Sequence, residues 1–172
     1  MSHHDDMKSI PIYPHTGAYA HANGEIDKFR ESNLANIACK AAIEAAIAKH
    51  FDGMHLKPQA VSEVMDVFGA ERVQYVLANT IQIKSWDGRF SRDNKAWAAK
   101  IDVVEDVTAG HDRRLGFVIN SHPAVLDGFV SQARQASRQQ EHKPSIRNQL
   151  HAATAAAKKV PSQIGKRKEA VR

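Results

Sequence analysis

The sequence has little of what builds a disulfide scaffold or a membrane span. Its 172 residues include a single cysteine, Cys39, which excludes an internal disulfide and any four-cysteine zinc site. Its unbroken apolar runs are only a few residues long, whereas a membrane-spanning helix needs about 20 residues. No cationic segment followed by an apolar stretch opens the sequence, so no signal peptide is expected. We therefore expect a cytoplasmic protein with no membrane partner.

The local signatures of common enzyme classes are also missing. The sequence contains no P-loop, no dinucleotide-binding glycine turn and no nucleophile elbow. The ten histidines do not follow zinc-ligand spacing, and His50 and His55 are not part of a His-Glu-x-x-His motif. Cys39 falls on the apolar side of an expected alanine-rich helix, where cysteine usually behaves as a small hydrophobic residue. We expect a binding protein rather than an enzyme, with no metal and no small-molecule cofactor.

The positive charge is concentrated near the C-terminal end of the sequence. The whole chain carries a net charge of +5, with 24 Lys and Arg against 19 Asp and Glu. Residues 1–130 contain 14 basic and 17 acidic side chains, whereas residues 131–172 contain 10 basic and 2 acidic ones. A basic segment attached to a mildly acidic body is typical of proteins that bind polyanions. The alternative is a tail that only adds solubility.

Apolar periodicity predicts an all-α fold, in which five to seven short helices form a compact domain. Ser32 or Asn33 is expected to cap the first long helix, and Gly53 to end it. Val73, Val76 and Ile81 mark the apolar face of a later helix and leave Arg72 off that face. The expected helices cover residues 34–51, 58–68 and 70–85, a short stretch after Ser91 that carries Trp97, and a segment from Pro123 past Ala136. Residues 115–119 are expected to form a strand or a buried extended segment.

The same pattern predicts three regions along the chain. Residues 1–10 are polar and without periodicity, which favours disorder. Residues 11–134 form the helical globular domain. Residues 135–172 form a basic helical arm and a disordered tail, because the helix expected over residues 145–159 has only two large apolar residues to bury.

Two groups of residues are candidates for nucleic-acid or partner binding. The first is a short turn in which aromatic rings and cations alternate, and the second is the basic arm. The candidates are Lys84, Trp86, Arg89, Arg92 and Lys95 in the turn, and Arg134, Arg138, Lys143, Arg147, Lys158, Lys159, Lys166, Arg167 and Lys168 in the arm. Exposed aromatic rings beside cations can stack bases or anchor a protein partner. The alternative, which we favour, is that Trp86, Phe90 and Trp97 hold the turn against the core while the cations stay in solvent.

Residues 102–112 are rich in acidic side chains. Asp102, Glu105 and Asp106, together with His111 and Asp112, would converge on a divalent cation if this loop folded back. A solvated acidic loop is the favoured interpretation. If the loop instead served a metal-dependent hydrolase, an Asp106→Asn substitution would abolish that activity.

Three segments and the Trp86-Asp87-Gly88-Arg89 turn resemble a known family. The segments are Tyr-Pro-His-Thr-Gly-Ala-Tyr-Ala-His-Ala-Asn-Gly-Glu at residues 13–25, Asn-Ile-Ala-Cys-Lys-Ala-Ala-Ile-Glu at residues 36–44 and Asn-Ser-His-Pro-Ala-Val-Leu-Asp-Gly-Phe at residues 120–129. They resemble a domain of unknown function carried by conjugative and integrative mobile elements of gut Firmicutes. The resemblance covers residues 11–134 and carries no activity with it.

What the resemblance implies is a cellular context. It predicts a non-enzymatic accessory protein of a mobile element that binds nucleic acid or a ribonucleoprotein, with inhibition of a Cas9-type CRISPR nuclease and its guide RNA as one form of that function. An inhibitor that mimics DNA would be strongly acidic, which this chain is not. The alternative is a protein-only adaptor, or a factor in plasmid processing, that does not touch nucleic acid.

Overall fold

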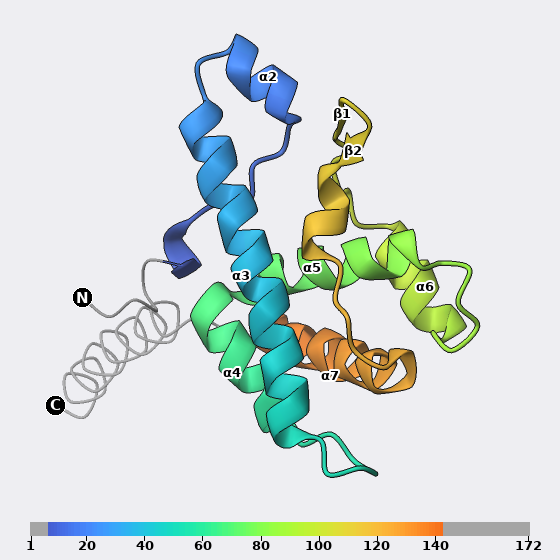
Figure 1. Ribbon diagram of the computed structural model, residues 1–172. Helices are drawn as coiled ribbons and strands as arrows, with labels where there is room; N and C mark the ends of the chain where they lie inside the picture. The colour runs from blue at the N-terminus through green and yellow to red at the C-terminus, as the bar shows by residue number, and fades with distance from the viewer. Residues whose placement is uncertain (1–6, 143–172) are drawn as a thin grey trace, which may run out of the picture. The chain divides into compact units, whose positions relative to one another are not determined.

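A computed structural model of the chain describes residues 7–142, and its fold is all-α (Figure 1). The chain divides into two compact units, residues 1–136 and residues 137–172. In chain order the elements are α2 (Gly17–Ala22), α3 (Ile26–His50), α4 (Gln59–Phe68), α5 (Ala70–Ile83), α6 (Arg92–Ala99), β1 (Val107–Thr108), β2 (His111–Asp112), the 3-10 helix η1 (Arg113–Phe117) and α7 (Pro123–His142). No helix within residues 7–142 has both the length and the hydropathy needed to cross a bilayer.

The long helix α3 runs through the first unit and presents two different surfaces to its neighbours (Figure 1). Its C-terminal half buries Cys39, Ile43 and Ile47, which recur every four residues and so share one stripe. Its N-terminal half instead buries two polar side chains, Ser32 and Asn36, at the same helical spacing. The helix therefore contributes to the apolar core at one end and to a polar site at the other.

The apolar core lies where α3, α4 and α5 meet. α5 packs against α3, α4, α6 and η1. Gly69 separates α4 from α5 with a φ of 83°, a conformation that glycine adopts without steric cost. Phe129 and Val130 of α7 are fully buried in the same core. The break expected between the helices over residues 58–68 and 70–85 is confirmed, because Gly69 ends α4 there.

The first long helix begins earlier than the sequence pattern indicates. α3 starts at Ile26, and Ser32 is not its cap but a buried residue inside it, 3% exposed. The Ser32 hydroxyl accepts a hydrogen bond from the backbone N–H of Tyr13 at 2.9 Å. The Ser32 hydroxyl, which the sequence pattern assigned to a helix cap, therefore binds a residue outside the helix. The prediction that the helix starts at Ser32 or Asn33 is wrong.

Two further segments differ from their expected structures. Residues 113–117 form η1 rather than a strand, and only Val118 and Ile119 continue in a buried, irregular conformation. Residues 7–9, which the sequence grouped with a disordered N-terminus, are helical, and Met7 packs against the core. Residues 1–6 and the helix expected over residues 145–159 lie outside the described residues.

Candidate functional site

The turn between α5 and α6 is held by a buried carboxylate. Asp87 is 5% exposed, and its Oδ1 accepts hydrogen bonds from the backbone N–H and the Nε of Arg89, both at 3.0 Å. Its Oδ2 accepts from Nη2 of Arg89 at 2.9 Å. These bonds from Arg89 lower the pKa of Asp87 to about 2. Phe90, 3% exposed, anchors the same turn in the core.

The side chain of Trp86 takes no part in anchoring this turn. Its side chain is 77% exposed, although indole is among the most costly surfaces to leave in water. The interpretation that Trp86 helps to hold the turn against the core is therefore wrong, because Phe90 and Asp87 do so. An exposed tryptophan on a fixed turn is the arrangement expected of a binding residue.

The start of α6 is docked on α7 by one fully buried amide. Nδ2 of Asn94 reaches Oδ1 of Asp127 at 2.8 Å, the Asp127 carbonyl at 3.1 Å and Oγ of Ser131 at 3.1 Å. The backbone N–H of Ser91 also donates to Oδ1 of Asp127 at 2.9 Å. Ser91 caps α6, as the sequence predicts, by accepting from Asn94 N at 3.3 Å. The turn that carries Trp86 is thus fixed at both of its ends.

The cations predicted to bind a partner have different surroundings. Arg89 is engaged by Asp87, and Arg134 lies 5.6 Å over the Trp97 ring while it donates to Oδ1 of Asn94 at 2.8 Å. Nζ of Lys84 donates to the Ile119 carbonyl at 3.5 Å. Arg92 is exposed, Lys95 is half-buried, and Arg138 is exposed within the second unit. Lys143, Arg147, Lys158, Lys159, Lys166, Arg167 and Lys168 lie outside the described residues.

Residues 84–95 are here called the Trp86 segment. They include all the binding residues that the sequence predicts in the turn. The segment contains four basic side chains and two acidic ones, and one acidic side chain, that of Asp87, is committed to Arg89. Arg134 reaches the segment from α7 through Asn94. The Trp86 segment is a cationic surface with one exposed aromatic ring.

The acidic loop is not simply solvated. Asp106 is 6% exposed, and its Oδ2 accepts from the backbone N–H of Gly17 at 2.9 Å. Nε of Arg113 lies 3.6 Å from the same oxygen, and Thr108 donates to Oδ1 at 3.3 Å. Among residues 7–142 no group of three or more His, Cys, Asp or Glu side chains is placed to hold a metal ion. Asp106 instead ties the loop to the N-terminal segment.

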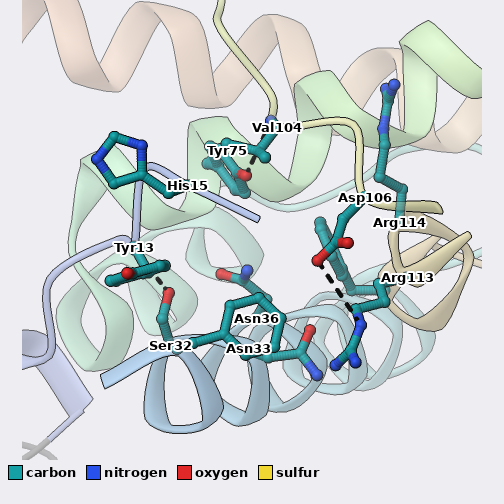
Figure 2. Close-up of a pocket in the computed structure, with 12 residues that line it drawn as sticks. Tyr13, His15, Ser32, Asn33, Asn36, Tyr75, Val104, Asp106, Arg113 and Arg114 are labelled. Carbon is teal, nitrogen blue, oxygen red and sulfur yellow. Dashed lines mark hydrogen bonds and ion pairs between the residues drawn. The ribbon is translucent and has the colours of Figure 1, made fainter. Parts of the chain in front are cut away.

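A polar pocket lies beside this contact, between the N-terminal half of α3 and η1 (Figure 2). Its cavity volume is about 30 Å³, enough for a few water molecules or one small polar group, and the pocket is partly open to solvent. Figure 2 shows the amide of Asn36 in the middle of the ring formed by the other side chains. The lining residues are Tyr13, His15, Phe29, Ser32, Asn33, Asn36, Tyr75, Val104, Asp106, Arg113, Arg114 and Phe117.

Close packing of the N-terminal segment closes one side of this pocket. The Tyr13 hydroxyl donates to Oε2 of Glu25 at 2.8 Å, and partial burial together with that carboxylate raises the pKa of Tyr13 to about 12. The Tyr13 ring meets Phe29 edge to face at 5.9 Å. A Cβ on Gly17 would come within 3.2 Å of the Phe29 ring, so a larger residue there would require the ring to move by a few tenths of an ångström.

A buried arginine lies beneath the pocket. Arg72 is 2% exposed, and its Nη1 donates to the Ser32 carbonyl at 3.0 Å and to Oδ1 of Asn36. Its Nη2 donates to the Ile10 carbonyl at 2.9 Å, and its Nε has no partner among the described residues. Burial lowers the pKa of this guanidinium. The sequence pattern places Arg72 off the apolar face of its helix and does not predict that it is buried.

The family model described as "Protein of unknown function (DUF3849)" matches residues 12–138. The chain belongs to the DUF3849 family. The matched residues include both the Trp86 segment and the pocket, so both are features of the DUF3849 region of this chain. The expectation of a domain of unknown function is confirmed. No curated protein and no solved structure matches the chain.

Sequence reasoning missed the pocket of this DUF3849 domain because its residues come from five separate stretches between residues 13 and 117. Two signals were present. The Tyr13-Pro14-His15-Thr16 stretch concentrates polar and aromatic side chains just before α2, and Arg72 is a charged residue in the first turn of α5. Neither feature indicates which residues, distant in the sequence, these side chains contact in the fold.

Proposed function

We propose that this DUF3849 chain is a binding protein, not an enzyme, and that it binds nucleic acid through the Trp86 segment. The observation that carries the proposal is the 77% exposure of Trp86 on a turn fixed by Asp87 and Phe90. An ordinary surface turn gains nothing from an indole in water. An aromatic side chain on an anchored backbone turn has only its own side-chain rotations to lose when it meets a partner.

Base stacking is the interaction that best suits this surface. Each base has a flat apolar face, and stacking on an aromatic side chain is worth about 1–3 kcal/mol. Lys84, Arg92 and Lys95 lie within nine residues of Trp86 in the sequence and enter no ion pair among the described residues. They are therefore available to neutralise phosphates. A stacked base must first be unpaired, so the proposed ligand is single-stranded.

The basic arm supports the same proposal from the sequence. Ten basic and two acidic side chains fall within residues 131–172. If five or six of these cations met phosphates, log K would fall with log salt at a slope of about −5. The arm would supply affinity, and the Trp86 segment would select unpaired bases.

The resemblance to proteins of conjugative and integrative elements supports a finer proposal. The chain would act as an accessory protein of such an element, on nucleic acid that is free or held in a ribonucleoprotein such as a CRISPR nuclease. Co-purification of tagged chain from a host cell, with and without nuclease treatment, tests this context. Loss of the partner on treatment supports the proposal.

The direct test compares the affinities of two variants for a labelled 20-nucleotide single strand, DNA or RNA. We expect Trp86→Ala to weaken binding about 5- to 150-fold, the equivalent of about 1–3 kcal/mol. Leu34→Ala is the matched control, because Leu34 is 65% exposed but lies on α3. It should bind as the unsubstituted chain does. Equal affinity of Trp86→Ala and the control would overturn the role of Trp86.

A protein-only adaptor predicts the opposite pattern. A protein partner anchored on Trp86 would persist after nuclease treatment, and a chain without residues 135–172 would retain it. Oligonucleotide binding would then be absent at physiological salt. The same two experiments therefore separate the two functions.

A further inference from the structure

The guanidinium of Arg72 is a buried cation without an acidic partner among the described residues. Arg72 is 2% exposed, and within residues 7–142 no Asp or Glu oxygen lies within ion-pair distance of it. Its partners are two backbone carbonyls and the amide oxygen of Asn36. A buried charge that is satisfied only by neutral dipoles is costly, and nearby negative charge would stabilise it.

Asn36 connects this cation to the pocket. A guanidinium can only donate hydrogen bonds, so the oxygen of the Asn36 amide must be the atom that faces Arg72. The NH2 of the amide is then directed away from Arg72, and Asn36 is both 5% exposed and part of the pocket lining. Arg72 thereby fixes Asn36 as a hydrogen-bond donor at the base of the pocket (Figure 2).

Other donors surround the same space. The hydroxyl of Tyr75, which is 8% exposed, accepts from Val104 N at 3.4 Å and so keeps its own proton free to donate. Arg113 adds a guanidinium whose side chain is 43% exposed at the rim, above the Phe29 ring at 4.9 Å. The one lining carboxylate, that of Asp106, already accepts hydrogen bonds from Gly17 and Thr108 and forms an ion pair with Arg113 at 3.6 Å. The pocket therefore offers donors and positive charge.

We propose that this pocket binds an oxyanion group of a small ligand, a carboxylate or a phosphate, which accepts from Asn36, Tyr75 and Arg113. The bound group lies one side chain away from Arg72 and supplies the negative charge that this guanidinium lacks. This site is separate from the Trp86 segment and does not depend on the proposed nucleic-acid binding.

Calorimetric titration of the full chain tests the proposal with three probes: inorganic phosphate, a nucleoside monophosphate and benzoate. We expect saturable binding of at least one, together with a rise in Tm that equal ionic strength of chloride does not produce. Stronger binding of the nucleotide than of phosphate assigns the oxyanion to a nucleotide, whereas stronger binding of benzoate assigns it to a carboxylate. The absence of saturable binding for all three at millimolar concentration overturns the proposal.

Three substitutions localise the site. Arg113→Gln removes the rim charge, and we expect it to weaken binding at least about 10-fold; Tyr75→Phe removes one donor and should weaken it about 5-fold. Arg92→Gln is the matched control, because it removes an exposed cation of the Trp86 segment. Equal weakening by Arg92→Gln and Arg113→Gln would indicate only non-specific attraction and would contradict the site. If Arg113→Gln does not fold, Tyr75→Phe decides, since unchanged affinity in that variant contradicts the assigned geometry.

The same variants keep this proposal apart from the proposed function. Trp86→Ala should leave binding of the small oxyanion unchanged. Arg113→Gln should leave the affinity for the labelled single strand within about twofold, because a surface substitution away from that segment removes no contact with the strand. Loss of one activity without the other identifies which proposal has failed.

Discussion

Asp87 shows how a single buried carboxylate can position an exposed side chain. It accepts three hydrogen bonds from Arg89, at 2.9 and 3.0 Å, and these bonds close the turn directly after Trp86. Its pKa is lowered to about 2 from an ordinary value of 3.8, mainly by the side chain of Arg89. The ionised form of Asp87 is therefore part of the folded turn.

This residue makes the stability of the domain depend on pH in acid. Because the folded pKa is below the unfolded one, the unfolded chain takes up the proton first as the pH falls. We expect the free energy of unfolding to fall between pH 4 and pH 2, and to fall less steeply in Asp87→Asn. Urea denaturation at several pH values measures both slopes. Identical slopes would show that Asp87 is not held by Arg89 in solution.

Residue identity alone did not reveal these roles. The Trp86-Asp87-Gly88-Arg89 stretch indicates a turn, and the turn is present. Which of its side chains points inward depends on Phe90 and on the core behind it, and the sequence pattern carries no such information. Arg72 is similar, because a charged residue at a helix start is usually exposed.

At the scale of elements, α6 depends on the fully buried Asn94. That amide donates to Asp127 and Ser131 on α7 and accepts from Arg134, so it joins three polar side chains of α7. Helix α6 has only eight residues, which is too few for stability without such packing. The position of the Trp86 segment follows from this docking.

We therefore expect Asn94→Ala to lower the free energy of unfolding by about 1–3 kcal/mol, since buried partners lose their hydrogen bonds. Urea denaturation provides the measurement. Asn23→Ala is the control, because Asn23 makes its side-chain bond to the Tyr19 carbonyl at an exposed helix end. That variant should change stability by no more than about 0.5 kcal/mol. A similar loss in both variants would contradict the docking role.

Local chemistry predicts some element boundaries and not others. Ser91 begins α6 and Gly69 ends α4, at the boundaries that the sequence predicts. Both roles depend only on residues nearby in the sequence. The start of α3 could not be predicted in this way. Ser32, the apparent cap, is taken by Tyr13, which lies 19 residues earlier in the chain.

For the whole molecule, the sequence predicts the fold class because apolar spacing is strictly helical through most of residues 34–133. It does not predict the pocket, whose members are brought together by contacts such as that between Gly17 and Asp106, 89 residues apart. The charge asymmetry is visible in the sequence alone.

The arm provides a prediction at this scale. Eight basic side chains lie within residues 143–172, against one acidic side chain. We expect the full chain to bind a single-stranded oligonucleotide with a log–log salt slope of about −5, and a chain ending at His142 to show a much shallower slope. Affinities measured at several salt concentrations give both values. Equal slopes would remove the arm from the proposed function.

If Trp86 stacks on nucleic acid, the fluorescence of its indole reports the contact directly. The chain has two tryptophans, so Trp97→Phe leaves Trp86 as the only indole. Titration of that variant with a single-stranded oligonucleotide is the decisive measurement. We expect saturable quenching of the Trp86 emission, with a midpoint that moves to higher oligonucleotide concentration as salt is added. Emission that stays constant while the oligonucleotide binds, or an oligonucleotide that does not bind, would contradict it.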